Sequence, residues 1–391
     1  MQITSRFNSN ISLVLIAGLS ISYVLSLFLL QLFAVSIFLL WLFEKNSEKK
    51  KAFDKLTFII IAFGVIRLLS IFFSEYPASS NESLYKEALF YISFAALHFY
   101  LKTFDKKIFS SVVLLFILGA GINALIAIVK FNFSIDERAQ SFSSGYAAFS
   151  SYILAALGLA LFYRQSIHKK YNDYLWAVIL SMLIAALITS LGRTNIALAT
   201  VIILTAIVLK QFSFKVISAV LVLTVLLTLL SFSNNKTSSL QSRVESPTQL
   251  SDRDIIFKGA EELAFEHPVL GFGPRTFHDI FPFKDEFADK GIGTWHNDFL
   301  QVYFESGVLG LIVFLILIFY LFYVSIINIR SKKLDKDYKK IAAGVFAAIF
   351  LLTASGLTAG FITSPVLSIV FVFLITTLSA INNKASVKKE S

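Results

Sequence analysis

The chain has 391 residues, of which 56% are hydrophobic and only 15% are charged, whereas soluble globular domains carry about 25% charged residues. The formal net charge of +10 fits nucleic-acid binding if taken alone, and the lack of cysteine excludes disulfides, thiol catalysis and cysteine-based metal sites. Apolar runs of about eighteen residues or more recur along the sequence, so we expect a single membrane domain that covers residues 1–391.

Predicted membrane-spanning helices follow one another along the chain. The first apolar run, residues 11–43, would measure about 50 Å as one helix, so we expect two short spans across the ~30 Å hydrocarbon core. Arg6 precedes this run, but the run is longer than a signal peptide's apolar core and no Ala-x-Ala site follows, so we expect it to stay attached. Further spans are predicted at 57–74, 84–101, 108–130, 145–163, 174–191, 195–209, 213–233, 299–327, 341–360 and 364–381. The prediction is an all-α, polytopic membrane protein of about twelve transmembrane helices.

The distribution of lysine predicts the topology. With about twelve spans and a cytoplasmic N-terminus, most of the lysines fall in cytoplasmic segments, as the positive-inside rule requires. The opposite loops are short and neutral or acidic, for example Glu75-Tyr76-Pro77. The basic charge therefore reflects membrane topology, and we expect a lipid bilayer and no nucleic acid as partner. The lysine-rich segments are 44–55, 102–107, 164–172, 210–215, 330–340 and 384–389.

Arginine is distributed differently from lysine. Five of the arginines and several histidines are predicted on the outer, extracytoplasmic side. A guanidinium group binds phosphate or carboxylate through two parallel hydrogen bonds, so this bias predicts an anionic ligand at the outer face. The predicted outer residues are Arg138, Arg193, Arg243, Arg253, Arg275, His267, His278 and His296.

Gly192-Arg193-Thr194-Asn195 is predicted to form the turn between spans seven and eight. Gly192 can close one helix and Thr194 or Asn195 can cap the next, so that Arg193 lies beside a helix N-terminus. Free N–H groups, the positive end of the helix dipole and a guanidinium together predict an anion site. The alternative is an arginine that reaches lipid phosphate, and the same two interpretations apply to Arg67, which lies within a span.

One large hydrophilic loop, residues 234–298, is predicted between spans nine and ten on the outer side. Ser251-Asp252 is typical of an N-cap, and the apolar spacing that follows predicts a helix that ends at His267-Pro268 and lies on the membrane surface or caps the spans. The turn at residues 270–275 contains two glycines that allow close approach to a ligand, with Arg275 within reach. The alternative for Arg275 is an ordinary solvated arginine.

The end of this loop carries a second polar group. Residues 295–298 (Trp-His-Asn-Asp) enter the tenth span, and Gln301 and Glu305 follow on one side of that helix. A lone carboxylate in a span costs about 2.5–3.5 kcal/mol, so Glu305 is expected to face protein or water. The alternative to a functional His296 is a polar helix cap with Trp295 as an interface anchor. Residues 252–254 have the Asp-x-Asp spacing of some metal sites, but here they predict a helix start, and we expect no metal.

Three of these stretches resemble the O-antigen ligase and O-antigen polymerase superfamily of bacterial envelope glycosyltransferases. They occur in the family's order around a long outer loop, and a weaker match precedes them at Arg138-Ala139 with Ser141-Phe142. The resemblance covers the chain from about Arg138 onward, and the earlier spans match only as hydrophobic helices. The matching stretches are 192–195, 251–275 and 296–310.

The resemblance implies a GT-C type membrane fold in the bacterial plasma membrane, with both termini in the cytoplasm and the active site on the outer side. It implies that an undecaprenyl-pyrophosphate-linked glycan moves to a sugar hydroxyl, on lipid A core in a ligase or on a lipid-linked repeat unit in a polymerase. By matching motif, Arg193, Arg275 and His296 are the expected catalytic residues. The expected substrate-binding residues are Arg253, Arg138, Glu305 and Arg67.

The chemistry of these residues agrees with that implication. Arginines that hold the leaving pyrophosphate can replace a metal, so no metal ion or other cofactor is expected. His296 is suited to take the acceptor proton, because a histidine pKa lies near ambient pH, and a single displacement inverts the anomeric centre. Ligase and polymerase are not separated by the sequence. A transporter is a more distant alternative, since twelve spans also suit transporters, but paired repeats are not evident. A scaffold without chemistry is disfavoured by Glu305 and Arg67 within apolar spans.

Overall fold

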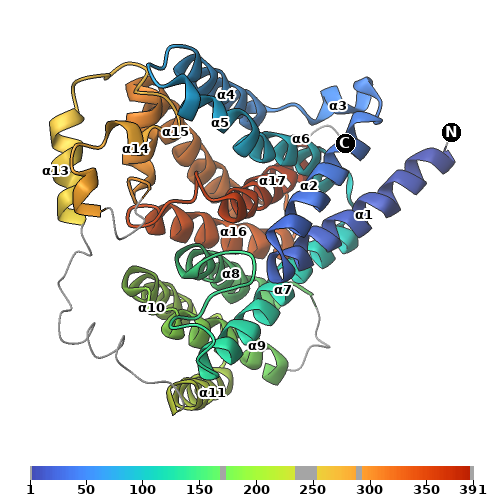
Figure 1. Ribbon diagram of the computed structural model, residues 1–391. Helices are drawn as coiled ribbons and strands as arrows, with labels where there is room; N and C mark the ends of the chain where they lie inside the picture. The colour runs from blue at the N-terminus through green and yellow to red at the C-terminus, as the bar shows by residue number, and fades with distance from the viewer. Residues whose placement is uncertain (1, 168–172, 234–252, 288–292, 388–391) are drawn as a thin grey trace.

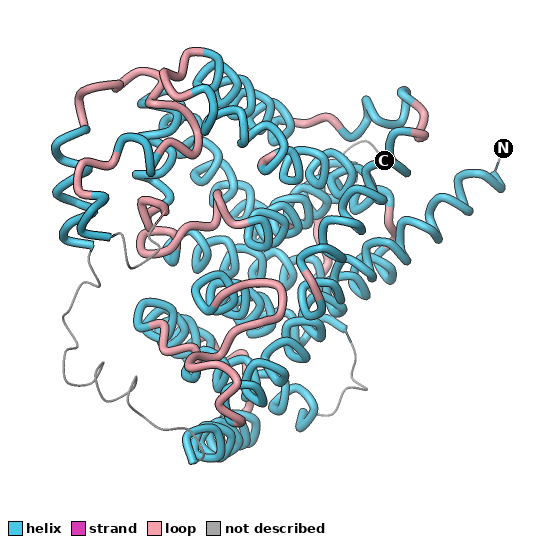
Figure 2. The backbone as a smooth tube through the Cα atoms, in the orientation of Figure 1, coloured by secondary structure: helices cyan, strands magenta, loops and turns pink. Residues whose placement is uncertain are grey.

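The computed structural model describes residues 2–167, 173–233, 253–287 and 293–387. All regular elements in these ranges are helical, as the tube in Figure 2 shows. The first half contains α1 (Gln2–Leu25), α2 (Leu27–Leu42), α3 (Asn46–Ala52), α4 (Lys55–Phe72), α5 (Pro77–Lys86), α6 (Ala88–Thr103), α7 (Lys106–Asn132), α8 (Tyr146–Ile167) and α9 (Asp173–Thr189). The second half contains α10 (Arg193–Val208), α11 (Phe214–Ser233), α13 (Arg253–Leu263), α14 (Phe277–Ile280), the short 3-10 helix η1 (Lys284–Phe287), α15 (Asp298–Arg330), α16 (Lys336–Ser355) and α17 (Pro365–Val387).

Seven helices of the described chain are long and apolar enough to cross a membrane: α4, α7, α8, α11, α15, α16 and α17. The pair α2 and α3, which is bent by 118°, counts as an eighth if it forms one span. Shorter apolar helices lie at Asn10–Leu25, Asp173–Thr189 and Arg193–Val208. The all-helical membrane fold is confirmed, whereas the number of about twelve spans stays a prediction.

Two apolar runs in the first half of the chain are divided between helices in the structure. The run at 11–43 breaks at Ser26, whose hydroxyl accepts a hydrogen bond from the Phe28 N–H (3.2 Å) and caps α2, as the two-helix prediction requires. The span predicted at 84–101 is wrong at its start, because α5 ends before Glu87 and α6 begins after it. The Glu87 carboxylate binds the Arg67 guanidinium on α4, which fixes this break in place.

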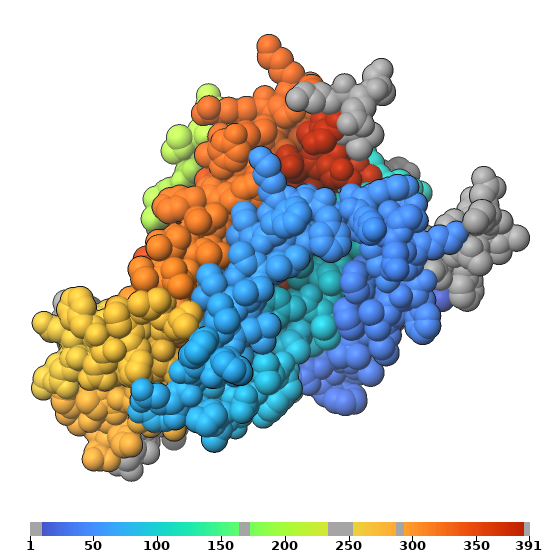
Figure 3. Space-filling view, turned by 90° about the horizontal axis from the view of Figure 1, so that it is seen from above, coloured from blue at the N-terminus to red at the C-terminus, as the bar shows by residue number. Residues whose placement is uncertain are grey.

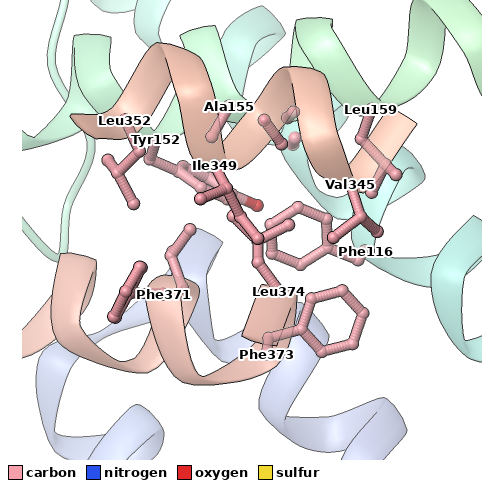
Figure 4. Packing of buried hydrophobic residues seen from close by; sticks show 14 of the residues in the cluster. Phe116, Tyr152, Ala155, Leu159, Val345, Ile349, Leu352, Phe371, Phe373 and Leu374 are labelled. Carbon is pink, nitrogen blue, oxygen red and sulfur yellow. The ribbon is translucent and has the colours of Figure 1, made fainter. Parts of the chain in front are cut away.

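Helices α7, α8, α16 and α17 pack around the buried aromatic and aliphatic side chains shown in Figure 4. The rings of Phe116 and Phe373 are stacked at 4.5 Å between their centroids. Two glycines let α8 and α16 approach closely: a Cβ at Gly158 would lie 2.7 Å from a Leu351 methyl group, and one at Gly344 would lie 2.8 Å from the Leu159 carbonyl oxygen. Small residues at helix contacts are typical of membrane proteins, where dispersion contacts replace the hydrophobic drive.

Helix α15 is broken at Gly307, which has φ +63° and ψ −168°. The loop before α14 fills the break: Val308 donates its N–H to the Pro268 carbonyl (2.7 Å), and Phe272 donates its N–H to the Phe304 carbonyl (2.7 Å). Because the loop backbone satisfies groups that the helix leaves open, the break carries no orphan donor at these positions. The span predicted as one helix at 299–327 is therefore two helical segments with a loop seated between them.

Gly307→Ala is expected to destabilise the protein by more than about 1–2 kcal/mol, the cost of a left-handed residue that carries a Cβ. The added Cβ would also lie 2.1 Å from the Val269 carbonyl oxygen, so the seated loop has to move. The measurement is the thermal unfolding midpoint in detergent. The control is Gly121→Ala within α7, where the nearest atom lies 3.6 Å away and the midpoint should stay unchanged or rise. Equal midpoints for both variants would contradict the prediction.

The loop elements lie together at one end of the bundle. In Figure 1, α13 and α14 are at the left, opposite the start of α1 and the end of α17. In Figure 3, seen from above, the yellow atoms of α13 lie at the lower left edge of the molecule. Helix α13 begins at Arg253 and buries one face, which includes Ile256, Ala260 and Leu263. That face packs on an aromatic cluster with Phe281 and Trp295. The loop therefore has its own small core, which holds α13 in place.

Candidate anion-binding active site

A cavity of about 130 Å³ lies where α8, α10, α13 and the loop after α16 meet. It is smaller than pockets that enclose drug-sized ligands, about 300–1,000 Å³, and its size suits an anionic head group. The described residues that line it include three arginines and no carboxylate. Its polar lining residues are Arg138, Tyr146, Ser150, Arg193, Thr194, Asn195, Arg253 and Thr358.

Arg193 is the first residue of α10, so the first N–H groups of this helix point toward the cavity that Arg193, Thr194 and Asn195 line. The helix dipole adds positive potential there. The predicted capping pattern needs correction, because Gly192 is the N-cap of α10 and no side chain caps the helix. The turn that ends α9 instead places Leu191 in the left-handed region, at φ +56°.

Asn195 holds α10 against two neighbouring helices. Its Nδ2 donates to the Ser150 hydroxyl (2.7 Å) on α8, and its Oδ1 accepts a hydrogen bond from the Ser355 hydroxyl (2.7 Å) at the end of α16. The side chain is buried. The sequence predicts Asn195 only as a helix cap. Its hydrogen-bond partners lie about 45 and 160 residues away along the chain, so local spacing does not reveal them.

Arg138 is fixed beside this helix start. Its Nε donates to the Ser190 carbonyl (2.9 Å), and its guanidinium lies over the Tyr146 ring at 3.2 Å from the centroid. Stacking on an aromatic ring holds the guanidinium plane in one orientation. Arg138, which belongs to the weaker sequence match, therefore lines the same cavity as the matching stretch 192–195.

Arg253 reaches the cavity from the start of α13. Its Nη2 donates to the Thr358 carbonyl (2.6 Å). Burial, and then the positive charge of Arg193, lower the pKa of Arg253 from its ordinary value, although an arginine stays charged. The positive charges of Arg193 and Arg253 repel each other, and an anion bound between them would attract both and offset this repulsion.

His296 lies close enough to Arg253 to respond to its charge. Burial, and then the positive charge of Arg253, lower the pKa of His296 below its ordinary value of 6.5. The residue has φ +48°, and its side chain is half-buried. Its imidazole is therefore neutral at neutral pH, which is the state that accepts a proton.

Residues 176–315 match the family model described as O-antigen ligase. This segment is similar to the O-antigen ligase family. The matched segment contains Arg193, Arg253 and His296, and the resemblance read from the sequence motifs is confirmed. No curated protein matches the chain. The chain is thus a multi-pass membrane protein that contains a segment similar to O-antigen ligases.

Arg275 does not line this cavity, although it was expected beside Arg193. It lines a separate cavity of about 40 Å³ with Lys86, Phe63 and Phe361. Its φ of +63° and the hydrogen bond from its backbone N–H to Glu305 Oε1 (2.6 Å) fix the turn in which it lies. The expectation that Arg275 and Arg193 share one cavity is therefore wrong, and a catalytic role for Arg275 stays a prediction.

Arg67 on α4 and Glu305 on α15 bind each other in the interior of the protein. The Arg67 Nη2 donates to Glu305 Oε2 (2.8 Å), and its Nε donates to Glu87 (2.9 Å). Arg67 is 2% exposed and Glu305 is 1% exposed. The other Glu305 oxygen accepts hydrogen bonds from the Gln301 amide and the Arg275 N–H. Glu305 faces protein, as expected, but these contacts favour a positioning role over substrate binding, which stays a prediction for both residues.

Trp295 lies in the core of the loop, which contradicts the alternative interpretation in which it is an interface anchor. It is 1% exposed, and its ring stacks on Phe304 at 3.9 Å between centroids. Its backbone N–H donates to Gln301 Oε1 (3.1 Å), which links the residue before His296 to the Glu305 network. The aromatic cluster thus positions both His296 and α13. Ser251 and Asp252, the predicted N-cap, lie outside the described residues, and α13 ends at Leu263, before the expected His267.

Proposed function

We propose that the chain transfers an undecaprenyl-pyrophosphate-linked glycan to a sugar hydroxyl, as an O-antigen ligase, at the outer face of the bacterial plasma membrane. The observation that carries the proposal is the convergence of Arg138, Arg193 and Arg253 with the α10 N-terminus on one cavity. A pyrophosphate carries several negative charges, and charge-assisted hydrogen bonds to it contribute about 1.5–3 kcal/mol each.

The arginines act on the leaving group. As the bond between the anomeric carbon and the pyrophosphate breaks, negative charge grows on the pyrophosphate oxygens. Guanidinium groups and helix N–H groups that are already in place stabilise this charge without reorganising. Arg138 is held by Tyr146 and Arg253 by Thr358, so both are preorganised. The proposed reaction needs no metal ion, because these groups supply the positive charge.

His296 acts on the acceptor. Its neutral imidazole removes the proton of the acceptor hydroxyl as the oxygen attacks the anomeric carbon from the side opposite the pyrophosphate. The expected contribution of such a base is about 10²–10⁴-fold in rate. A single displacement inverts the anomeric centre, so a product with retained configuration in an NMR spectrum would exclude this mechanism.

The proposed acceptor is a lipid A core sugar. In the alternative of the same superfamily, a repeat-unit polymerase, it is another lipid-linked repeat unit. A deletion strain separates the two. Long undecaprenyl-linked chains without surface attachment indicate a ligase, and single repeat units attached to the acceptor indicate a polymerase. Complementation by the wild-type chain but not by Arg253→Gln is expected in both cases, and full complementation by Arg253→Gln would contradict the proposed site.

The pH dependence of the reaction is expected to report the contact between His296 and Arg253. Protonated His296 cannot act as a base, so kcat/KM falls toward acid with an apparent pKa below the ordinary 6.5. In Arg253→Gln the repelling charge is gone, the protonated imidazole becomes more favourable, and the acidic limb moves to higher pH. The control Arg275→Gln should leave the limb in place. An acidic limb that does not move in Arg253→Gln would show that the titrating group is not His296.

A further inference from the structure

The loop that joins α16 to α17, residues 356–364, lines the anion cavity and contacts the start of α15. Thr358 and Ala359 line the anion cavity, and the Thr358 carbonyl holds Arg253. Ser355, directly before the loop, donates to Asn195 next to Arg193. In Figure 1 this loop lies at the end of the bundle that carries α13. We call residues 356–364 the α16–α17 loop, and no sequence motif pointed to it.

Asp298 fastens the α16–α17 loop to the segment that carries His296. Its carboxylate accepts hydrogen bonds from the N–H groups of Phe361 (3.0 Å) and Ile362 (3.1 Å), and its own N–H donates to the Gly356 carbonyl (2.8 Å). Asp298 is 0% exposed. A Cβ at Gly356 would lie 2.5 Å from Asp298 Oδ2, so the loop backbone runs directly against this carboxylate.

Capping of α15 does not explain the Asp298 carboxylate. Asn297 is the N-cap, and its side chain accepts hydrogen bonds from the Phe299 and Leu300 N–H groups. Within the described chain, no cationic side chain forms an ion pair with Asp298. A buried carboxylate without a cation is expensive. The hydrogen bonds that offset this cost come from N–H groups of the α16–α17 loop. The Asp298 carboxylate therefore holds this loop in place.

We propose that Asp298 is a positioning residue that sets the distance between Arg253 and His296 through the α16–α17 loop. The connection runs from His296 along the chain to Asp298, across hydrogen bonds to Phe361 and Ile362, along the loop to Thr358, and across its carbonyl to Arg253. This inference rests on the proposed function, in which Arg253 holds the pyrophosphate and His296 takes the proton.

The absence of cysteine permits a test that does not use activity. Ala359→Cys introduces a single thiol into the half-buried lining of the cavity, and its rate of modification by a methanethiosulfonate reagent reports how closely the loop is held. Adding Asp298→Asn puts an amide N–H₂ where an acceptor is needed, so the rate is expected to rise several-fold. The matched control is Asp279→Asn, which changes an exposed carboxylate on α14 and should leave the rate unchanged. Equal rates in both variants would overturn the proposal.

Inorganic pyrophosphate serves as a second probe of the same thiol. It is expected to protect Ala359→Cys from modification, and less so when Asp298→Asn or Arg253→Gln is added. If pyrophosphate gives no protection, the anion site of the proposed function is wrong, while the modification rates still decide the role of Asp298. If protection is seen but no glycan is transferred, the positioning role stands and the proposed reaction fails.

Kinetics separate positioning from simple loss of structure. Asp298→Asn is expected to lower kcat by about 10²-fold, the scale of a misplaced catalytic geometry, with a smaller change in KM. Because Asp298 acts through Arg253, the further loss should be small when Asp298→Asn is added to Arg253→Gln. Losses that multiply in the double variant would show that the two residues act independently and would overturn the proposal. Thermal unfolding midpoints, with Asp298→Ala as the more severe variant, verify that the compared proteins are folded.

Discussion

Arg253→Gln is expected to lower the rate of glycan transfer by about 10²–10³-fold, the effect of removing one preorganised group that stabilises charge in a transition state. Glutamine keeps a polar side chain that can still donate to the Thr358 carbonyl, but it lacks the charge that the departing pyrophosphate needs. Arg193→Gln should have an effect of the same size, because both arginines line one cavity. The measurement is transfer from a purified lipid-linked donor in membrane vesicles, with the amount of folded enzyme held equal.

Arg275→Gln is the matched control for these variants. It removes the same guanidinium from the same large loop between α11 and α15, but at a position that lines a different cavity. Its loss of rate is expected to be less than about tenfold, since its N–H contact to Glu305 is made by the backbone and survives the substitution. A severe loss in Arg275→Gln together with a mild one in Arg253→Gln would reverse the roles that the structure gives to the two residues.

Arg67→Met is expected to lower the free energy of unfolding by about 3–5 kcal/mol, because it leaves carboxylates buried without their cation. Arg67 holds Glu305 and Glu87 together, and Glu305 in turn holds Gln301 and the Arg275 N–H. The measurement is the thermal unfolding midpoint of the purified protein in detergent. Adding Glu87→Gln and Glu305→Gln to Arg67→Met removes the uncompensated charges and should recover part of the loss.

Lys51→Met is the control for this stability change. Lys51 pairs with Glu48 on the surface of α3, where side chains are solvated, so the expected loss is at most about 1 kcal/mol. If Arg67→Met has an effect as small as Lys51→Met, then the buried network does not support the fold, and Arg67 would again be a candidate for substrate contact.

Much of the fold follows from local features of the sequence. Each predicted apolar run contains a helix in the described chain, because a bilayer leaves backbone groups no partner except those of a helix. The break at Ser26 followed from the length of one run, and the position of Arg193 at a helix start followed from the glycine before it. These features depend on spacing and on neighbouring residues, which a single sequence contains.

The division of α5 from α6 and the break in α15 depended on distant partners. Glu87 is fixed by Arg67, and Gly307 is matched by a loop backbone about forty residues earlier. Hydrophobic periodicity does not record such contacts, because it reports only whether a position is apolar. Hydrophobic periodicity also gave no sign of the α16–α17 loop. This loop contributes backbone carbonyl and N–H groups to the site, and these groups do not depend on residue type.

The sequence by itself determined an all-helical membrane protein, a resemblance to the ligase and polymerase superfamily, and a set of arginines with one histidine as the candidate site. Only the tertiary structure decided which arginines share a cavity. It brought Arg138, Arg193 and Arg253 together and left Arg275 outside. The physical reason is that a motif fixes residue types, whereas the direction of a side chain depends on its own φ and on the backbone contact that holds it. For Arg275, these are a left-handed turn and a hydrogen bond to the buried Glu305.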